Sequence, residues 1–468
     1  MRMRETIPSI SLVLVGFLVG PAAAMFMEPN DVPVDRVLEN ISPQVQQHPR
    51  DPRGHYLLGR VHYLAWSLKT GYTPTWDPSP EPGTGLPKIV GDALVGTAEW
   101  QLQRMRRAEA TRLALAELGL DSVRDVHGDA LELFWKQVRA KEKDLAAAGW
   151  EPPGRPSQEQ LDAHARHAIL HFRKAIELDP QNALYHLGLA DIRRQYAARA
   201  GQTGLGPDAD QLFDPGDPDL VGMWNRAALE DYASAFNLSR AGDVELKNVP
   251  VEGLGALVSL GAIEGYARVA QALGKGAQDA RLVKSMREHK ARLQALPPGP
   301  VTPIIFSFQP GRSLDQLLAP DTLVRFDLDG DGREELRPWV GPDAVILVWD
   351  PNRTGRITSG RQLFGTVTWW LFWPTGYEAL GALDDDGDGR LSGPELGGLA
   401  LWSDRDQDAR CDPGEVVPIE RTGVAALACR PLRHDGPGPM HPRGVELEDG
   451  TFLPTWDWVA PAVRTVKP

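Results

Sequence analysis

The feature that most constrains the fold of this chain is a change of sequence pattern at residues 297–300, which read PPGP. Before this stretch, from about Asp31 to Leu296, apolar residues recur at intervals of three and four, which predicts α-helices. After it, short strand-like runs alternate with acidic loops, and a cluster of proline and glycine is typical of a domain boundary. We therefore expect a multidomain chain, with an α-helical part at residues 31–296 and an α+β part at residues 301–468.

Length and charge limit the classes of function. The chain has 468 residues, of which 42% are hydrophobic, and these values are typical of a globular protein with more than one domain. Its formal net charge is −13. A nucleic-acid or anionic-lipid partner would require a basic surface, so we expect neither.

Residues 1–24 have the layout of a signal peptide. Arg2 and Arg4 precede an apolar run at residues 10–20, and three alanines at residues 22–24 offer a cleavage site. We therefore expect an exported protein, periplasmic or extracellular. Because Glu5 weakens the basic start of this segment, an uncleaved membrane anchor is the alternative.

The stretch DDDGDGRLSGPE at residues 384–395 carries the clearest chemistry. It places acidic side chains at loop positions one, three, five and twelve, namely Asp384, Asp386, Asp388 and Glu395. Oxygen donors in this number suit Ca²⁺ better than Mg²⁺. The segment resembles an EF-hand calcium loop, in which the residue at position seven, here Arg390, contributes its backbone carbonyl. A solvated acidic turn without metal is the alternative.

Three further loops follow this pattern less closely, at residues 404–415, 327–335 and 350–362. The loop at 404 has alanine instead of glycine at position six, and its predicted ligands are Asp404, Asp406, Asp408, Arg410 and Glu415. The loop at 327 lacks an acid at position twelve, and its predicted ligands are Asp327, Asp329, Asp331 and Glu335. The loop at 350 has Thr354 and Gln362 where acids are expected. We rank the loops as calcium sites by the number of charged donors and by the presence of an acid that closes the loop. The resulting order, from best to poorest, is the loops that begin at 384, 404, 327 and 350.

The spacing of the four loops indicates what calcium would do. Loop starts lie 23 residues apart in the first pair and 20 apart in the second, which leaves room for one short element between them. Residues 301–439 contain no methionine, so the Met-rich groove of a calcium sensor is not expected. This half resembles the compact tandem EF-hand segments of exported bacterial proteins. The resemblance implies a structural calcium module, which we expect to end in a hairpin at residues 446–459 and to unfold separately when calcium is removed.

The helical half carries a second resemblance. At residues 168–192, Ala168, Phe172 and Ala175 share one helix face and Pro180 ends the helix, as in the tetratricopeptide repeat (TPR). Looser copies occur at residues 48–66 and 228–239, with a helical pair at 251–273 and 277–296 and insertions at 70–158 and 201–220. The resemblance implies a TPR-like array that binds a protein or peptide partner in a concave groove, lined here by His55, His62, Tyr185 and Arg193.

Three histidines at residues 164, 167 and 171 lie along one edge of a predicted helix. Three imidazoles on an edge can hold zinc, but no carboxylate or cysteine completes the set locally, so we favour partly buried or groove-lining histidines. The alternative function is a metal-dependent hydrolase built from His164, His167, His171 and the insertion at 70–158, which offers Glu109, Asp125 and His127. Since no catalytic motif is present, a non-enzymatic protein is the preferred interpretation.

Two features leave two interpretations each. Cys411 and Cys429 either form a disulfide or remain buried thiols. The segment at residues 366–374 is dense in aromatics, which either form an exposed recognition patch or fill the core beneath the acidic loops. We favour the core.

Overall fold

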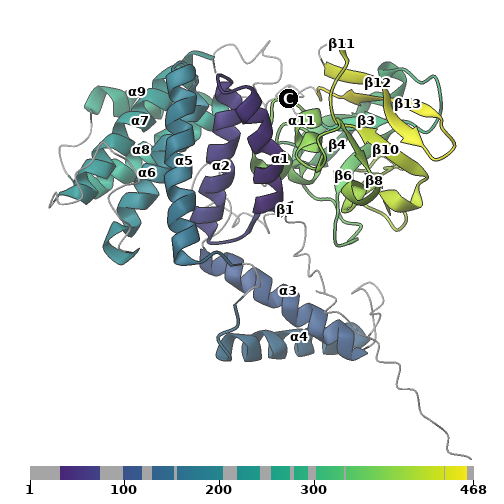
Figure 1. The fold of residues 1–468 in the computed structure, drawn as a ribbon, viewed down its shortest axis with the longest axis horizontal. Helices are drawn as coiled ribbons and strands as arrows, with labels where there is room; N and C mark the ends of the chain where they lie inside the picture. Colours follow the sequence, from purple (N-terminus) through teal and green to yellow (C-terminus); the bar gives the residue numbers. More distant parts are fainter. Residues whose placement is uncertain are drawn as a thin grey trace, which may run out of the picture.

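The structure is a computed structural model with a helical region followed by an antiparallel sheet domain (Figure 1). It describes residues 32–73, 98–118, 129–151, 155–203, 219–242, 255–274, 279–293, 302–330, 334–436 and 438–460. The predicted signal peptide, Asp125, His127 and Asp331 lie outside these residues. Among the helices described, none combines the length and the hydropathy needed to cross a membrane.

The helical region contains long helices that pack as neighbours. Their bounds are α1 Val34–Gln47, α2 Pro52–Leu68, α3 Ala98–Leu118, α4 Asp129–Ala147, α5 Gln158–Leu178, α6 Ala183–Thr203, α7 Leu220–Gly242, α8 Gly255–Leu273 and α9 Ala280–Leu293. Helix α2 packs on α5, α5 on α6, α6 on α7 and α7 on α8. The insertion between α2 and α5 holds α3 and α4, which pack on each other and stand apart from the other helices (Figure 1).

One aromatic ring fixes how three of these helices meet. Phe172 of α5 is fully buried and faces glycines on both neighbours. A Cβ atom would lie 2.9 Å from this ring if built on Gly59 of α2, and 2.7 Å if built on Gly188 of α6. Glycine at both positions therefore lets the helices approach a large side chain, and the buried face predicted around Phe172 is confirmed.

The predicted concave groove is wrong in its lining residues. Tyr185 is only 2% exposed, Arg193 7% and His62 9%. Arg193 donates a hydrogen bond from Nη1 to Asp231 Oδ2 at 2.7 Å. Because α5 and α7 cover α2 and α6, these side chains lie between helices, and of the four predicted residues only His55 is partly exposed.

The second half forms an antiparallel sheet in the strand order β7-β10-β12-β13-β3-β6-β8-β9, with β11 beside β12. The strands are β3 Ile304–Phe306, β6 Val345–Trp349, β7 Arg390–Ser392, β8 Leu399–Trp402, β9 Val416–Pro418, β10 Val424–Ala428, β11 Arg433–Asp435, β12 Gly438–Leu447 and β13 Phe452–Asp457. Smaller two-stranded sheets join β1 Val32–Pro33 to β2 Tyr72–Thr73, and β4 Leu318–Phe326 to β5 Glu335–Val340. The predicted carboxyl-terminal hairpin is confirmed as β12 and β13, with Gly450 at φ +82° in its turn.

Short helices lie between these strands. They are α10 Leu314–Leu317, α11 Gly376–Gly381 and the 3-10 turns η3 Gly360–Gln362, η4 Thr368–Trp370, η5 Gly393–Leu396 and η6 Ile419–Arg421. The aromatic segment around η4 is buried, with Trp369 fully enclosed and Trp373 3% exposed. The core interpretation of this segment is therefore confirmed.

The two halves share one hydrophobic core. Arg60 of α2 donates from Nε to the carbonyl of Trp370 at 3.4 Å, and its guanidinium lies 5.2 Å from the ring centre of Phe372. The boundary in the sequence pattern is thus real as a change of architecture, but the helical region packs directly on the sheet domain.

Both cysteines carry free thiols in this structure. Cys411 accepts a hydrogen bond at Sγ from the backbone N–H of Ile357 at 3.2 Å. Cys429 donates from Sγ to Asp384 Oδ2 at 3.4 Å. The structure therefore follows the interpretation with two thiols, and each thiol contacts one of the acidic loops.

Candidate metal centres

The third acidic loop, residues 384–395, connects α11 to η5 and begins at a buried carboxylate. Asp384 is 7% exposed. Its two oxygens accept hydrogen bonds from the backbone N–H groups of Gly387 at 2.9 Å and Gly389 at 3.0 Å. Gly389 has φ +87°, a left-handed conformation that glycine adopts without strain. The chain is thereby wrapped around the residue at position one.

Glu395 closes the same loop. It is also 7% exposed. Its Oε1 accepts from the N–H of Asp385 at 2.7 Å, and its Oε2 accepts from the N–H of Ser392 at 2.9 Å. The residue at position twelve therefore ties positions two and nine together from inside the loop.

Three carboxylates of this loop come close enough to share one ion. Oxygens of Asp384, Asp386 and Glu395 lie within 4.8 Å of one another. Like charges at about 4 Å repel by about 4 kcal/mol at an effective dielectric constant of 20. Asp388 is exposed, and its Oδ1 accepts the N–H of Arg390 at 2.7 Å, so it stands outside this close group.

The fourth loop, residues 404–415, repeats most of this arrangement. The equivalent hydrogen bonds run from Ala409 N–H to Asp404 at 2.8 Å, from Arg410 N–H to Asp408 at 2.8 Å, and from the N–H groups of Arg405 and Asp412 to Glu415 at 2.8 and 3.1 Å. Oxygens of Asp404, Asp406 and Glu415 again lie within 4.8 Å of one another. Ala409 takes the left-handed conformation of Gly389, with φ +59°, so the missing glycine does not prevent the turn.

Asp404 has a setting of its own. It is 1% exposed, and Nε1 of Trp339 donates to its Oδ2 at 2.5 Å. Burial raises the pKa of Asp404 to about 6, against the lowering effect of the Ala409 and Trp339 hydrogen bonds. A nearby cation would favour the ionised form, so burial and metal binding oppose each other at this carboxyl.

The first loop holds the third acidic group and a cation of its own. Oxygens of Asp327, Asp329 and Glu335 lie within 4.8 Å of one another. Glu335 reaches the N–H of Leu328 at 3.4 Å, which is the contact that the twelfth residue makes in the third and fourth loops. The fully buried Arg337 guanidinium lies 3.9 Å from Asp329 and 3.7 Å from Glu335. This arginine offsets the charge that would otherwise attract a metal ion.

The second loop is closed by neutral groups. Asp350 accepts from the backbone N–H and the hydroxyl of Thr354 at 2.9 and 2.7 Å, and from Gly355 N–H at 2.6 Å. Oε1 of Gln362 accepts from the N–H of Thr358 at 2.9 Å. Within the described residues, Asp350 belongs to none of the close acidic groups. The sequence ranked this loop last of the four as a calcium site, and its hydrogen bonds to neutral groups agree with that ranking.

The third and fourth loops are joined through one short strand, β8, in the space that their spacing left for one short element. Strand β7, in the third loop, pairs with β10 and not with the fourth loop. The fourth loop instead contacts the second, where Cys411 Sγ lies 3.2 Å from the N–H of Ile357 and 3.6 Å from its carbonyl oxygen. The third loop carries β7 at one end of the strand order, whereas the fourth loop lies between β8 and β9 at the other end.

A pocket of about 820 Å³ lies beside the second and third loops, between the two halves. Helix α1 contributes Arg36, and β6 and the loop after it contribute Trp349 and Arg353. Arg353 pairs with Glu420. The lining includes Asp350 of the second loop but none of the residues in the three close acidic groups.

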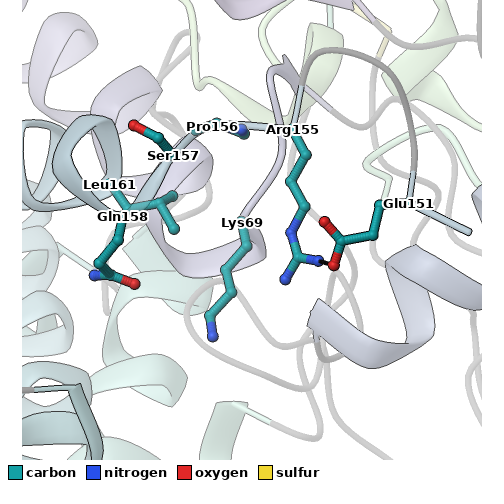
Figure 2. A pocket seen from close by; sticks show the side chains of 7 residues that line it. All are labelled: Lys69, Glu151, Arg155, Pro156, Ser157, Gln158 and Leu161. Carbon is teal, nitrogen blue, oxygen red and sulfur yellow. Dashed lines mark hydrogen bonds and ion pairs between the residues drawn. The ribbon is translucent and has the colours of Figure 1, made fainter. Parts of the chain in front are cut away.

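A smaller pocket of about 340 Å³ involves part of the insertion named in the hydrolase alternative. It lies where the insertion ends and α5 begins, and Figure 2 shows Lys69 and Arg155 extending side by side into it, with Arg155 paired to Glu151. Its seven lining residues include none of the histidines at 164, 167 and 171. Glu109 is bound by Arg112 within α3. This pocket therefore contains residues from the end of the insertion and none from the histidine row.

Sequence reasoning missed three neighbours of the acidic loops, namely Arg337, Trp339 and Cys429. Arg337 and Trp339 lie on β5, and Cys429 directly follows β10. Trp339 and Cys429 contact Asp404 and Asp384, which are distant in the sequence, so these two contacts depend on the tertiary arrangement. It also missed that His55 and His62 of α2 face the histidines of α5, although their spacing of seven residues places both on one helix face.

Residues 314–436 match the sequence model of the SPM domain. This span begins at α10, ends just after β11 and contains all four acidic loops. No curated protein matches the chain.

Proposed function

We propose that the sheet domain binds calcium through its third and fourth loops, as an EF-hand-type module in an exported, non-enzymatic protein. The observation that carries the proposal is the repeated carboxylate triad, Asp384, Asp386 and Glu395 in one loop and Asp404, Asp406 and Glu415 in the other. Two loops with the same hydrogen bonds at positions one, five and twelve favour a shared ligand over two unrelated acidic turns. Hard oxygen donors favour Ca²⁺ over transition metals.

The role proposed for calcium is structural. Each triad confines charges that repel one another, and an ion bound to the folded form alone stabilises it by about 2.7 kcal/mol at a hundredfold excess over Kd. The first loop, whose acids lie beside Arg337 of β5, is the weaker third site.

Calorimetric titration of the full chain with CaCl₂ tests this function. We expect two to three sites, with one removed by Asp386→Asn and another by Asp406→Asn, each losing at least about tenfold in affinity. Both side chains are exposed, so the variants should fold. The matched control is Asp315→Asn, an exposed acid outside the loops. Unchanged binding in both loop variants, or no binding by the parent, would contradict the proposal.

We further propose that the TPR-like helical region binds a protein or peptide partner. The feature that favours this is the α3–α4 hairpin, which stands apart from the array and exposes Leu118 (46%) and Leu133 (59%). Exposed leucines on a projecting element offer apolar contact area without rearrangement of the core.

Crosslinking in the exported fraction tests the second part. The Leu118→Asp/Leu133→Asp variant should lose the crosslinked partner, whereas Leu170→Asp, at a leucine of α5 that is 61% exposed, should retain it. If both variants kept the partner, the hairpin would not be the binding element.

A further inference from the structure

Five histidines meet at the seam between α2 and α5. Helix α2 contributes His55 and His62, which are seven residues apart and therefore on one face. Helix α5 contributes His164, His167 and His171. The whole chain has 11 histidines, so nearly half of them lie at this one helix pair.

The imidazoles form two close pairs around a shared centre. Nδ1 of His62 lies 2.8 Å from Nδ1 of His164, and Nδ1 of His55 lies 3.0 Å from Nδ1 of His171. The ring centre of His62 also lies 4.9 Å from that of His167 and 6.1 Å from that of His171. The His62 ring therefore lies close to the rings of all three histidines of α5.

These separations suit imidazoles that share a metal ion. With Zn–N bonds of about 2.0–2.1 Å, two imidazoles on one tetrahedral ion have ring centres about 5 Å apart. The ring centres of His62 and His164 are 5.1 Å apart, close to the 4.9 Å between His62 and His167. Among the described residues, only acidic groups already place three ligand atoms within 4.8 Å of one another. One ring must therefore turn, and His167 is exposed on its helix and has room to do so.

The charge at the seam also suits a cation. His62 is only 9% exposed, so an ion bound to it would be largely shielded from water. Asp35 of α1 lies close enough to His164 to interact with it electrostatically. A carboxylate that sequence inspection did not place beside the histidines is therefore supplied by a third helix.

We propose that His62, His164 and His167 form a binding site for a divalent transition metal of the zinc class, independent of the calcium loops. Imidazole nitrogen is a borderline ligand that favours Zn²⁺, Ni²⁺, Cu²⁺ or Co²⁺ over Ca²⁺. Water completes the coordination, and the Asp35 carboxylate offsets part of the charge of the ion. His55 and His171 form a second close pair beside this site.

Cobalt provides a probe with its own spectrum. The full chain, saturated with CaCl₂, is titrated with Co²⁺ and then with Zn²⁺. We expect one equivalent of Co²⁺ to give the visible bands of a tetrahedral site with nitrogen ligands, and Zn²⁺ to displace them. Absence of these bands together with absence of stoichiometric Zn²⁺ binding would overturn the proposal and leave the seam as hydrogen-bonded packing.

Variants identify the ligands. His167→Ala, at an exposed position, should fold and should lose at least about tenfold in Zn²⁺ affinity. His434→Ala, at an exposed histidine of β11, is the matched control and should bind as the parent does. His164→Ala should abolish the Co²⁺ bands, with circular dichroism as the check on folding. Parental affinity in both His167→Ala and folded His164→Ala would overturn the assignment.

Discussion

Arg36 of α1 forms a two-pronged ion pair with Asp385, the second residue of the third acidic loop. Its Nε donates to Oδ1 at 2.8 Å and its Nη2 to Oδ2 at 3.0 Å. One turn later, Asn40 donates from Nδ2 to Asp385 Oδ1 at 2.9 Å and to the carbonyl of Ala382 at 2.8 Å. The start of the proposed calcium loop is therefore attached to the first helix of the other half.

This contact predicts that calcium stabilises both halves together. The sequence predicted that the sheet domain would unfold separately in chelator, whereas the shared core and the Arg36–Asp385 pair favour one transition. Scanning calorimetry should show a single transition that moves down by several degrees when calcium is chelated. A helical signal that melts at the same temperature with and without calcium would contradict this coupling.

The helix contact itself can be weakened without touching a proposed ligand. Arg36→Ala combined with Asn40→Ala should lower stability by about 1 kcal/mol, because the pair is partly exposed and such pairs are weak. It should also broaden or split the transition. Arg226→Ala, which breaks an exposed pair with Asp219 inside the helical region, is the control and should leave the transition whole.

The sequence was most informative where a short pattern determines local geometry. The backbone hydrogen bonds around Asp384 and Glu395 are local, so the D-x-D-x-D-G pattern was enough to place them. The contact of Ile357 with Cys411 and the approach of Trp339 to Asp404 join segments that are more than 50 residues apart in the sequence. No local pattern encodes such contacts, which is why the sequence did not indicate which segments would pack against each acidic loop.

The helical groove shows the same limit. The small-large-small face around Phe172 follows from helical periodicity and was predicted correctly. Tyr185 and Arg193 were placed on a groove because adjacent helices of a regular array leave one surface open. Here the insertion places α2 directly on α5, and the neighbouring helices close over the residues that were expected to face a partner.

A second prediction concerns the thiol beside the third loop. Cys429 is 3% exposed, and burial, followed by the charge of Asp384, raises its pKa well above the usual range. We expect this thiol to react slowly with Ellman's reagent in calcium and much faster in chelator, when the repelling carboxylates open the loop. The Cys411→Ser variant isolates the signal of Cys429. Equal rates in calcium and chelator would show that the loop stays closed without metal.

A third prediction concerns the glycine beneath Phe172. Gly→Ala inside a helix ordinarily stabilises by about 1 kcal/mol. At Gly188 the new methyl group would lie 2.7 Å from the Phe172 ring, so we expect Gly188→Ala to destabilise by about 1–3 kcal/mol in urea unfolding.

Two variants separate this packing effect from helix propensity. Gly222→Ala in α7, where the nearest atoms belong to the exposed side chain of Asp219, should be neutral or stabilising. Phe172→Leu combined with Gly188→Ala should recover part of the loss, because the smaller side chain leaves room for the methyl group. A Gly188→Ala variant as stable as the parent would show that α5 and α6 can separate at no cost.

The last prediction uses a buried acid away from the metal centres. Asp457 of β13 is 1% exposed, and its Oδ2 accepts the N–H of Gly376 at 2.8 Å. Burial raises the pKa of Asp457 from 3.8 to about 8, against the lowering effect of that hydrogen bond. Between these values the folded state holds a proton that the unfolded state has released. Stability conferred by this group is therefore present at low pH and falls as pH rises toward 8, by up to about 1.4 kcal/mol per pH unit.

Asp457→Asn removes this titration and keeps an oxygen to accept from Gly376. Urea unfolding in saturating calcium at pH 5 and pH 8 should show the variant gaining on the parent as the pH rises, with the larger advantage at pH 8. Asp321→Asn, at an exposed acid of β4, is the control and should change the unfolding free energy by the same amount at pH 5 and at pH 8. The contrary result would be the same difference in unfolding free energy between Asp457→Asn and the parent at both pH values. Asp457 would then be ionised at pH 5 as well as at pH 8. A cationic or hydrogen-bond donor group near its second oxygen would have to stabilise that buried charge.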